Sequence, residues 1–166
     1  MTRKLLLVVL SIVAVTQFSC LKSIDCDFSE CEVVAPQSEI TVISNYLAAN
    51  TLTATQHCSG LFYTVNTTGA GKKPDACSNV HVKYVGRLAN GNVFDQQITD
   101  GLSIGLNQVI RGWRVGIPLM NAGGSITLYI PPTLGYGAQD LRDGAGNVVI
   151  PGNSMLIFNV DLVNAQ

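Results

Sequence analysis

The sequence predicts an α+β fold, in which an antiparallel β-sheet packs against one short central helix and a further helix precedes the sheet. Several short segments alternate apolar and polar residues, which is typical of strands with one buried face. The only tryptophan, Trp113, lies in the apolar stretch 107–120. All sixteen glycines fall between Gly60 and Gly152, so the composition changes near residue 60. We therefore place the folded domain at 60–166, preceded by a helix and linker at 37–59.

Residues 1–19 have the pattern of a secretory signal peptide: a basic pair, an apolar run, and small residues at its end. The run is short for a spanning helix, although an uncut membrane anchor is the alternative. Cys20 follows the small Ser19, as in the bacterial lipoprotein box, whereas Gln17 and Phe18 depart from that box. We expect Cys20 to be acylated.

Residues 20–36 are acidic and irregular, and they are interpreted as a tether held by the lipid on Cys20. Each buried CH₂ contributes about 0.8 kcal/mol, so several acyl chains on one residue anchor a chain stably. The expected location is therefore a membrane surface facing the periplasm or the cell exterior.

The four remaining cysteines form an even set in an exported chain, which predicts two disulfides. They are Cys26, Cys31, Cys58 and Cys77. The favoured pairing is Cys26–Cys31, closing a local loop, and Cys58–Cys77, joining the first strand of the domain to the entry of the next. Four cysteines allow three connectivities.

The charge pattern argues against a nucleic-acid partner. The formal net charge is −1, and removal of residues 1–19, which carry two basic and no acidic residues, leaves about −3. Phosphate binding requires clustered lysine and arginine, which the chain lacks. No CxxC pair occurs, and His57 and His81 have no partners at metal-ligand spacing, so we expect no metal. No phosphate loop or GxSxG motif is present, and no cofactor is expected.

Residues 38–50 predict one amphipathic helix ahead of the domain. Ile40, Ile43 and Leu47 recur at helical spacing, Ser38 is a candidate N-cap, and Asn50 marks the end. We expect this face to pack against the domain; a dimerising helix is the alternative.

Five segments predict strands. Alternating residues occur at 61–65, 80–84, 126–130 and 156–162, and a returning strand begins at Phe94-Asp95. Asn90-Gly91 supplies the positive φ angles of a tight hairpin turn, and Pro131-Pro132 ends a strand.

The stretch around Trp113 predicts the central helix. Pro118 limits this helix to about two turns, because an internal proline removes a hydrogen bond and clashes with the preceding turn. Arg111-Gly112 is expected to let the backbone turn sharply, so that the indole lies flat as the floor of a pocket. Alternatively, Trp113 only anchors the core.

Three motifs resemble the FKBP-type peptidyl-prolyl isomerases, over about residues 60–163. They are VHVKYVGRLANGNVFD at 80–95, LSIGLNQVIRGWRVGIPLM at 102–120, and GGSITLYIPPTLGYG at 123–137 with VVIPGNSMLIFNVDLV at 148–163. The resemblance implies that family's fold, a twisted antiparallel sheet wrapped around one short helix, and catalysis without a cofactor.

The resemblance also implies a proline-binding pocket. Its catalytic positions would be Tyr84, Asp95, Trp113 and Tyr136, and its other substrate-binding positions Phe94, Leu102, Ile104, Val109, Ile110, Ile150 and Phe158. By the same resemblance, Trp113 is the floor, and the Ile110 N–H and the Tyr136 hydroxyl hold substrate carbonyls. Asp95 would meet the twisting amide or orient Tyr84.

This sequence departs from the family pattern at Leu102 and Ile104, where the family usually has phenylalanines. One pocket wall is therefore aliphatic. The loop 137–149 is longer than the family minimum, and in this family it overhangs the pocket, so we expect it to influence substrate choice.

The resulting expectation is an enzyme that accelerates rotation about X-Pro bonds in unfolded or nascent exported polypeptides. One alternative is a chaperone module at the membrane that binds proline-containing segments without turnover. The other is a structural lipoprotein whose pocket has closed. The sequence does not indicate the oligomeric state.

Overall fold

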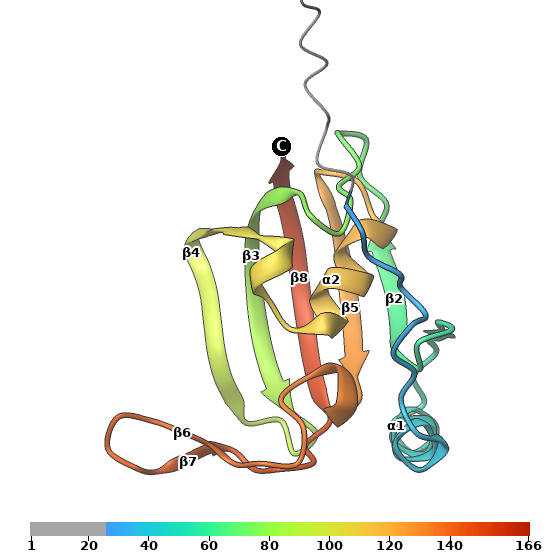
Figure 1. The fold of residues 1–166 in the computed structure, drawn as a ribbon, viewed down its shortest axis with the longest axis vertical. Coiled ribbons are helices and arrows are strands. Elements are labelled where there is room, and N and C mark those ends of the chain that lie inside the picture. Colours follow the sequence, from blue (N-terminus) through green and yellow to red (C-terminus); the bar gives the residue numbers. More distant parts are fainter. Residues whose placement is uncertain (1–25) are drawn as a thin grey trace, which may run out of the picture.

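The structure, a computed structural model, describes residues 26–166 and contains a six-stranded antiparallel sheet in this part of the chain (Figure 1). The strand order is β1-β2-β5-β8-β3-β4. The strands are β1 (Thr55–Gln56), β2 (Phe62–Thr67), β3 (Asn79–Leu88), β4 (Val93–Gly105), β5 (Gly124–Ile130) and β8 (Leu156–Ala165). A separate hairpin pairs β6 (Leu141–Arg142) with β7 (Val148–Ile150). The predicted signal peptide and the acylation of Cys20 lie outside the described residues.

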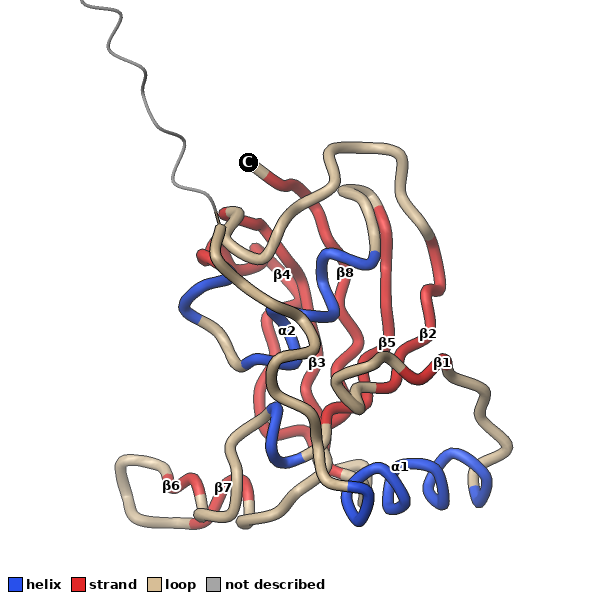
Figure 2. The backbone as a smooth tube through the Cα atoms, turned by 45° about the vertical axis from the view of Figure 1, so that its right-hand side comes forward, coloured by secondary structure: helices blue, strands red, loops and turns tan. Residues whose placement is uncertain are grey.

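Two α-helices accompany the sheet within residues 26–166, and Figure 2 labels both of them. They are α1 (Gln37–Ala49) and α2 (Arg111–Gly116); three short 3₁₀ turns are η1 (Leu106–Gln108), η2 (Ile117–Leu119) and η3 (Pro132–Leu134). This arrangement confirms the predicted α+β class, the short central helix and the additional N-terminal helix. In the described residues, no helix combines the length and apolar character that crossing a membrane requires.

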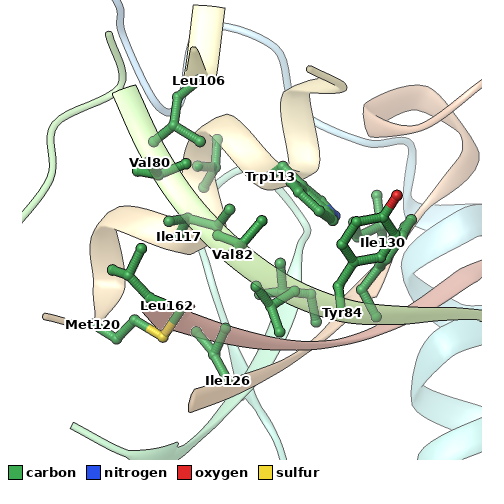
Figure 3. Packing of buried hydrophobic residues seen from close by; sticks show 14 of the residues in the cluster. Val80, Val82, Tyr84, Leu106, Trp113, Ile117, Met120, Ile126, Ile130 and Leu162 are labelled. Atoms are coloured by element: carbon green, nitrogen blue, oxygen red, sulfur yellow. The ribbon is translucent and has the colours of Figure 1, made fainter. Parts of the chain in front are cut away.

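Helix α2 lies across one face of the sheet, in close contact with β5 (Figures 1 and 3). A Cβ atom added to Gly112 would lie 2.5 Å from Cγ2 of Ile130, and one added to Gly116 would lie 2.5 Å from Cδ2 of Leu128. The expected sharp turn at Gly112 was wrong, because this glycine is helical. Its missing side chain instead lets the helix approach the sheet closely enough to bury Trp113.

Helix α1 covers the opposite face at one end of the sheet. Phe62, Tyr129 and Ile157 are register partners across β2, β5 and β8, and neighbouring strand residues point to opposite faces. These three side chains form a second apolar cluster with the buried face of α1, which consists of Ile40, Ile43 and Leu47. The predicted packing face of this helix is therefore confirmed.

The start of α1 differs from the prediction. Ser38 lies inside the first turn, and the N-cap is Pro36, which makes no side-chain capping hydrogen bond. The first N–H groups of a helix have no acceptor within the helix. Proline has a fixed φ and no N–H, so at the start of α1 it leaves no donor unpaired. Glu39 in the same turn accepts hydrogen bonds from the N–H and hydroxyl of Thr133, at 3.0 and 2.8 Å, and so ties α1 to η3.

The hairpin between β3 and β4 uses a positive φ at one residue. Gly91 has φ +89°, whereas Asn90 is not among the residues with positive φ in the described chain. The Asn90 side chain instead accepts the N–H of Asn92 at 3.0 Å.

The disulfide pairing corrects the prediction. Cys26 is joined to Cys77, with Cα atoms 5.7 Å apart, and Cys31 is joined to Cys58, with Cα atoms 5.6 Å apart. All four cysteines pair, as predicted, but both bonds connect the N-terminal segment to the rest of the chain. The local bond Cys26–Cys31 was wrong because this segment runs along the folded domain rather than looping back on itself.

In the described part of the predicted tether, residues 28–32 lie against α2. The Phe28 ring lies beneath two guanidinium groups of that helix, with Cζ of Arg111 4.7 Å and Cζ of Arg114 4.1 Å from the ring centroid. Arg111 also donates to the Ser29 carbonyl at 2.7 Å and lies 3.6 Å from the Glu32 carboxylate. These contacts fix the segment beside the helix that carries Trp113.

Candidate active site

A cavity of about 290 Å³ opens beside the N-terminal end of α2. Strand β3 contributes one residue, β4 three, η1 and the turn after it three, α2 one, the turn after η3 one, and β8 one. The lining residues are Tyr84, Asp95, Leu102, Ile104, Gln108, Val109, Ile110, Trp113, Tyr136 and Phe158.

Nine of the eleven predicted pocket residues line this cavity, and two do not. Phe94 packs against the lining residue Phe158, and the two ring centroids are 5.4 Å apart. Ile150 is buried in the main core, with 2% of its surface exposed. Gln108 lines the cavity but was missed. Its position directly before Val109, in the same stretch as Trp113, was the available signal.

Trp113 forms the buried base of the cavity, with 4% of its surface exposed. Its ring meets Tyr84 and Phe158 edge to face, with centroids 4.9 and 5.2 Å apart. Its Nε1–H has no hydrogen-bond partner among the described residues, and Figure 3 shows the nitrogen end of the indole directed toward Tyr84.

Tyr84 and Asp95 form the polar edge of the cavity. The Tyr84 hydroxyl donates to Asp95 Oδ2 at 2.7 Å. Burial, together with this hydrogen bond and the negative charge of Asp95, raises the pKa of Tyr84 well above its ordinary value. The hydroxyl therefore remains protonated, and it keeps donating to the carboxylate throughout the physiological pH range.

Two further polar groups lie at the cavity and can hold a bound peptide. Tyr136 is 43% exposed, and burial, followed by the charge of Asp95, raises the pKa of its hydroxyl. The backbone N–H of Ile110 makes no hydrogen bond to any acceptor in residues 26–166. One hydroxyl and one backbone donor are thus available for carbonyl oxygens.

A glycine in β3 makes room for the aromatic wall. Gly86 is opposite Phe158 on β8, and a Cβ atom added to it would lie 2.7 Å from the rings of both Phe158 and Phe94. A glycine inside a strand often marks such a close approach. The edge-to-face pair of Phe94 and Phe158 therefore depends on the missing side chain.

The loop 137–149 does not line the cavity. It forms the β6–β7 hairpin, which projects beyond the end of the main sheet in Figure 1. Asp140 anchors its base, accepting from Arg142 and from the Gly152 N–H, each at 2.9 Å. The lining residue nearest to this hairpin along the chain is Tyr136.

The described residues bring one group of potential metal ligands together away from this cavity. The side-chain donor atoms of Cys31, His57 and Cys58 lie within 4.8 Å of one another. The two sulfurs are joined as a disulfide, so neither is a thiolate in this structure.

The family comparison matches residues 70–163, more than half of the chain, to the model of the FKBP-type peptidyl-prolyl cis-trans isomerases. A probable FKBP-type peptidyl-prolyl cis-trans isomerase of Haemophilus influenzae is 43% identical over 110 residues, which cover 65% of this chain and 44% of that protein. The enzyme FkpA of Aeromonas hydrophila is 40% identical over 124 residues, covering 71% and 43% respectively. This chain thus spans less than half the length of these two curated relatives.

Solved structures agree with this match. The crystal structure of a peptidyl-prolyl cis-trans isomerase from Pseudomonas syringae superposes with a TM-score of 0.66 at 31% identity, over 80% of this chain and 97% of that one. The family match covers η1, α2 and the strands that line the cavity. The chain belongs to the FKBP-type peptidyl-prolyl cis-trans isomerase family.

Proposed function

We propose that this chain accelerates cis-trans rotation about X-Pro bonds in unfolded or nascent exported polypeptides. The observation that carries the proposal is the cavity itself: a buried tryptophan floor and apolar walls, with a tyrosine–aspartate pair and a free backbone donor at the edge. Family membership supports the same activity.

The chemistry requires neither a nucleophile nor a metal. Rotation about a peptide bond has a barrier of about 18–20 kcal/mol, because the amide loses its resonance. The uncatalysed X-Pro step takes tens to hundreds of seconds. An acceleration of about a thousandfold to ten-thousandfold corresponds to only about 4–5.5 kcal/mol. Desolvation in an apolar cavity plus one or two hydrogen bonds is sufficient for this.

Differential binding explains how the cavity provides this energy. The planar amide carries a large dipole that water solvates well, and the twisted amide has lost part of it. An apolar cavity therefore disfavours the planar ground state more than the twisted transition state. The pyrrolidine ring rests on Trp113, while Ile104 and Phe158 exclude water from it.

The polar groups have positioning roles in this proposal. The Ile110 N–H and the Tyr136 hydroxyl donate to substrate carbonyls on either side of the proline. Asp95 holds Tyr84 in place through the 2.7 Å hydrogen bond and presents its carboxylate to the twisting amide. Leu102 makes the neighbouring wall aliphatic.

Export and anchoring belong to the same proposal. Two disulfides are typical of an oxidising compartment, and the pattern around Cys20 fits acylation. Palmitate labelling of the chain in a bacterial host tests this part, with Cys20→Ser as the control. Label in the parent that is absent from the variant supports the anchor, and an unlabelled parent contradicts it.

A protease-coupled assay on short X-Pro peptides tests the activity. The full chain should accelerate the cis-to-trans step, and Trp113→Ala should lose most of the acceleration while circular dichroism remains unchanged. Asp95→Asn keeps the side-chain size and should also slow turnover. A folded parent that gives no acceleration with any residue before proline contradicts the enzyme. Retained peptide binding in that case would favour a non-catalytic chaperone.

A further inference from the structure

The two disulfides have different surroundings. Cys26 and Cys77 are half-buried, and the Cys77 sulfur accepts a contact from Arg114 Nη2 at 3.5 Å. Cys31 and Cys58 are both exposed. Exposed disulfides are open to attack by external thiolates, and labile or catalytic disulfides come from this class.

A histidine lies against one sulfur of the exposed disulfide. The Cys58 sulfur is 3.6 Å from Nδ1 and 3.8 Å from Nε2 of His57, so it contacts the ring and not the end of a single N–H. An imidazole this close can stabilise a thiolate that forms on Cys58. Cys31 Sγ also lies within 4.8 Å of a ring nitrogen of His57, but only the Cys58 sulfur is in direct contact with the ring.

Neighbouring groups hold the imidazole in place. Its Nδ1 accepts the backbone N–H of Ser59 at 3.2 Å and lies 3.0 Å from the hydroxyl of the same residue. Nε2 lies 3.3 Å from Glu30 Oε2. Since Nδ1 is the acceptor in the neutral ring, the proton sits on Nε2 and points at the carboxylate. Glu30 and Ser59 together therefore orient the ring beside the Cys58 sulfur.

From these contacts we infer that Cys31–Cys58 is a thiol–disulfide exchange site, in which Cys31 is attacked and Cys58 leaves. The arrangement of a sulfur, an imidazole and a carboxylate is the nucleophile, base and orienting group of other cysteine chemistry. This activity goes beyond the proposed isomerisation and does not depend on it.

The exchange is balanced without a further reagent. A thiolate of a cysteine-containing polypeptide attacks Cys31 Sγ, a new S–S bond forms, and the Cys31–Cys58 bond breaks. Its electron pair passes to Cys58 Sγ as a thiolate beside His57. A second thiolate of the polypeptide then attacks its own sulfur in the mixed disulfide. The polypeptide leaves oxidised by two electrons, and Cys31 and Cys58 remain as the dithiol.

The position of Cys31 suits a polypeptide substrate. Cys31 lies between Ser29 and Glu32, and both contact Arg111, which follows the cavity residue Ile110. The exchange site is thus connected to the helix that carries Trp113. Unfolded polypeptides with free cysteines are the expected partners.

Glutathione tests the inference on the full, oxidised chain. Samples are quenched with acid at successive times, and peptide mass spectrometry then maps the mixed disulfides. Glutathione should appear first on Cys31, and Cys31–Cys58 should open at least about tenfold faster than Cys26–Cys77. Equal opening rates, or glutathione mainly on Cys58, would overturn the inference.

Two variants separate a chemical role of His57 from a structural one. His57→Gln should slow opening of Cys31–Cys58 by about tenfold, and Glu30→Gln, at an exposed position, should slow it by a smaller factor. Both variants should open Cys26–Cys77 at the parent rate, whereas a structural disturbance of the N-terminal segment would change that rate too. Arg114→Gln, beside the other disulfide, is the matched control and should leave this rate unchanged. If both His57→Gln and Glu30→Gln open Cys31–Cys58 at the parent rate, the roles assigned to His57 and Glu30 are contradicted.

Discussion

The Tyr84 hydroxyl donates to Asp95 Oδ2 over 2.7 Å, between the adjacent strands β3 and β4. Tyr84 is buried, whereas Asp95 is exposed. The hydrogen bond therefore connects the interior of the cavity wall to its open edge, and each side chain restricts the other. The two side chains therefore act as one unit.

The first prediction concerns this pair. Tyr84→Phe and Asp95→Asn should each lower isomerase kcat/KM by roughly tenfold, the effect of losing about 1.4 kcal/mol from a hydrogen bond to a charged group. Because both changes remove the same interaction, the double variant should be little worse than the more damaging single one. Steady-state kinetics on an X-Pro peptide measures all three. Fully additive losses would mean that the two side chains act independently.

The second prediction concerns alkaline pH. The pKa of Tyr84 is raised in the folded chain, whereas in the unfolded chain it is about 10. Above pH 10 the unfolded chain therefore loses a proton that the folded chain keeps, and the free energy of unfolding falls as pH rises. One proton contributes at most about 1.4 kcal/mol per pH unit.

Urea unfolding at pH 9 and pH 11 measures this effect, with the parent compared to Tyr84→Phe. The variant should lose less stability between these two pH values than the parent. Tyr129 and Tyr136 also have raised pKa values and remain in both proteins, so the difference isolates Tyr84. An identical loss in both proteins would contradict the assignment.

The third prediction concerns the aromatic wall. Gly86→Ala places a Cβ atom 2.7 Å from the Phe94 and Phe158 rings and should lower the free energy of unfolding by about 1–3 kcal/mol. The displaced rings should also reduce isomerase activity. Gly144→Ala is the matched control, since a Cβ atom there meets nothing within 4 Å, and it should stay within about 0.5 kcal/mol of the parent. Equal denaturation midpoints for the two variants would refute the packing argument.

The fourth prediction concerns Phe28. Phe28→Leu keeps an apolar side chain but removes the ring beneath Arg111 and Arg114, and each cation–π contact is worth about 0.5–1 kcal/mol. The free energy of unfolding should therefore fall by about 1–2 kcal/mol. Phe28→Ala should cost more, because it also removes apolar contact. Denaturant titration with both disulfides intact distinguishes the two, and a Leu variant as stable as the parent would exclude a cation–π contribution.

The strands and the central helix could be predicted because their signals are local. Alternation of apolar residues follows directly from the two faces of a strand, and Pro118 limits the helix whatever surrounds it. The pocket residues came from motifs whose order matches a known family. Phe94 and Ile150 are the two of these residues that do not line the cavity, because sequence does not distinguish a lining residue from one that packs against it.

The disulfide pairing could not be predicted because it depends on the path of residues 26–36. This path is fixed by contacts far apart in sequence, such as Phe28 against Arg114 and Arg111 against the Ser29 carbonyl. Spacing favoured the short loop Cys26–Cys31. The predicted N-cap, Ser38, was wrong for a related reason. The hydrogen bond from the Ala35 N–H to the Ser59 carbonyl positions the chain so that the helix begins after Pro36.

The Cys26–Cys77 bond also determines how the chain bears mechanical load. A pull on the chain ahead of Cys26 passes through this covalent bond to Cys77, two residues before β3. The load therefore bypasses α1 and β2 and enters the sheet at the strand that carries Tyr84. Strand β3 is hydrogen-bonded along its length to both β4 and β8, so tension there is shared by three strands. If the chain is anchored on the N-terminal side of Cys26, a bound polypeptide that exerts a pulling force should therefore leave the cavity intact.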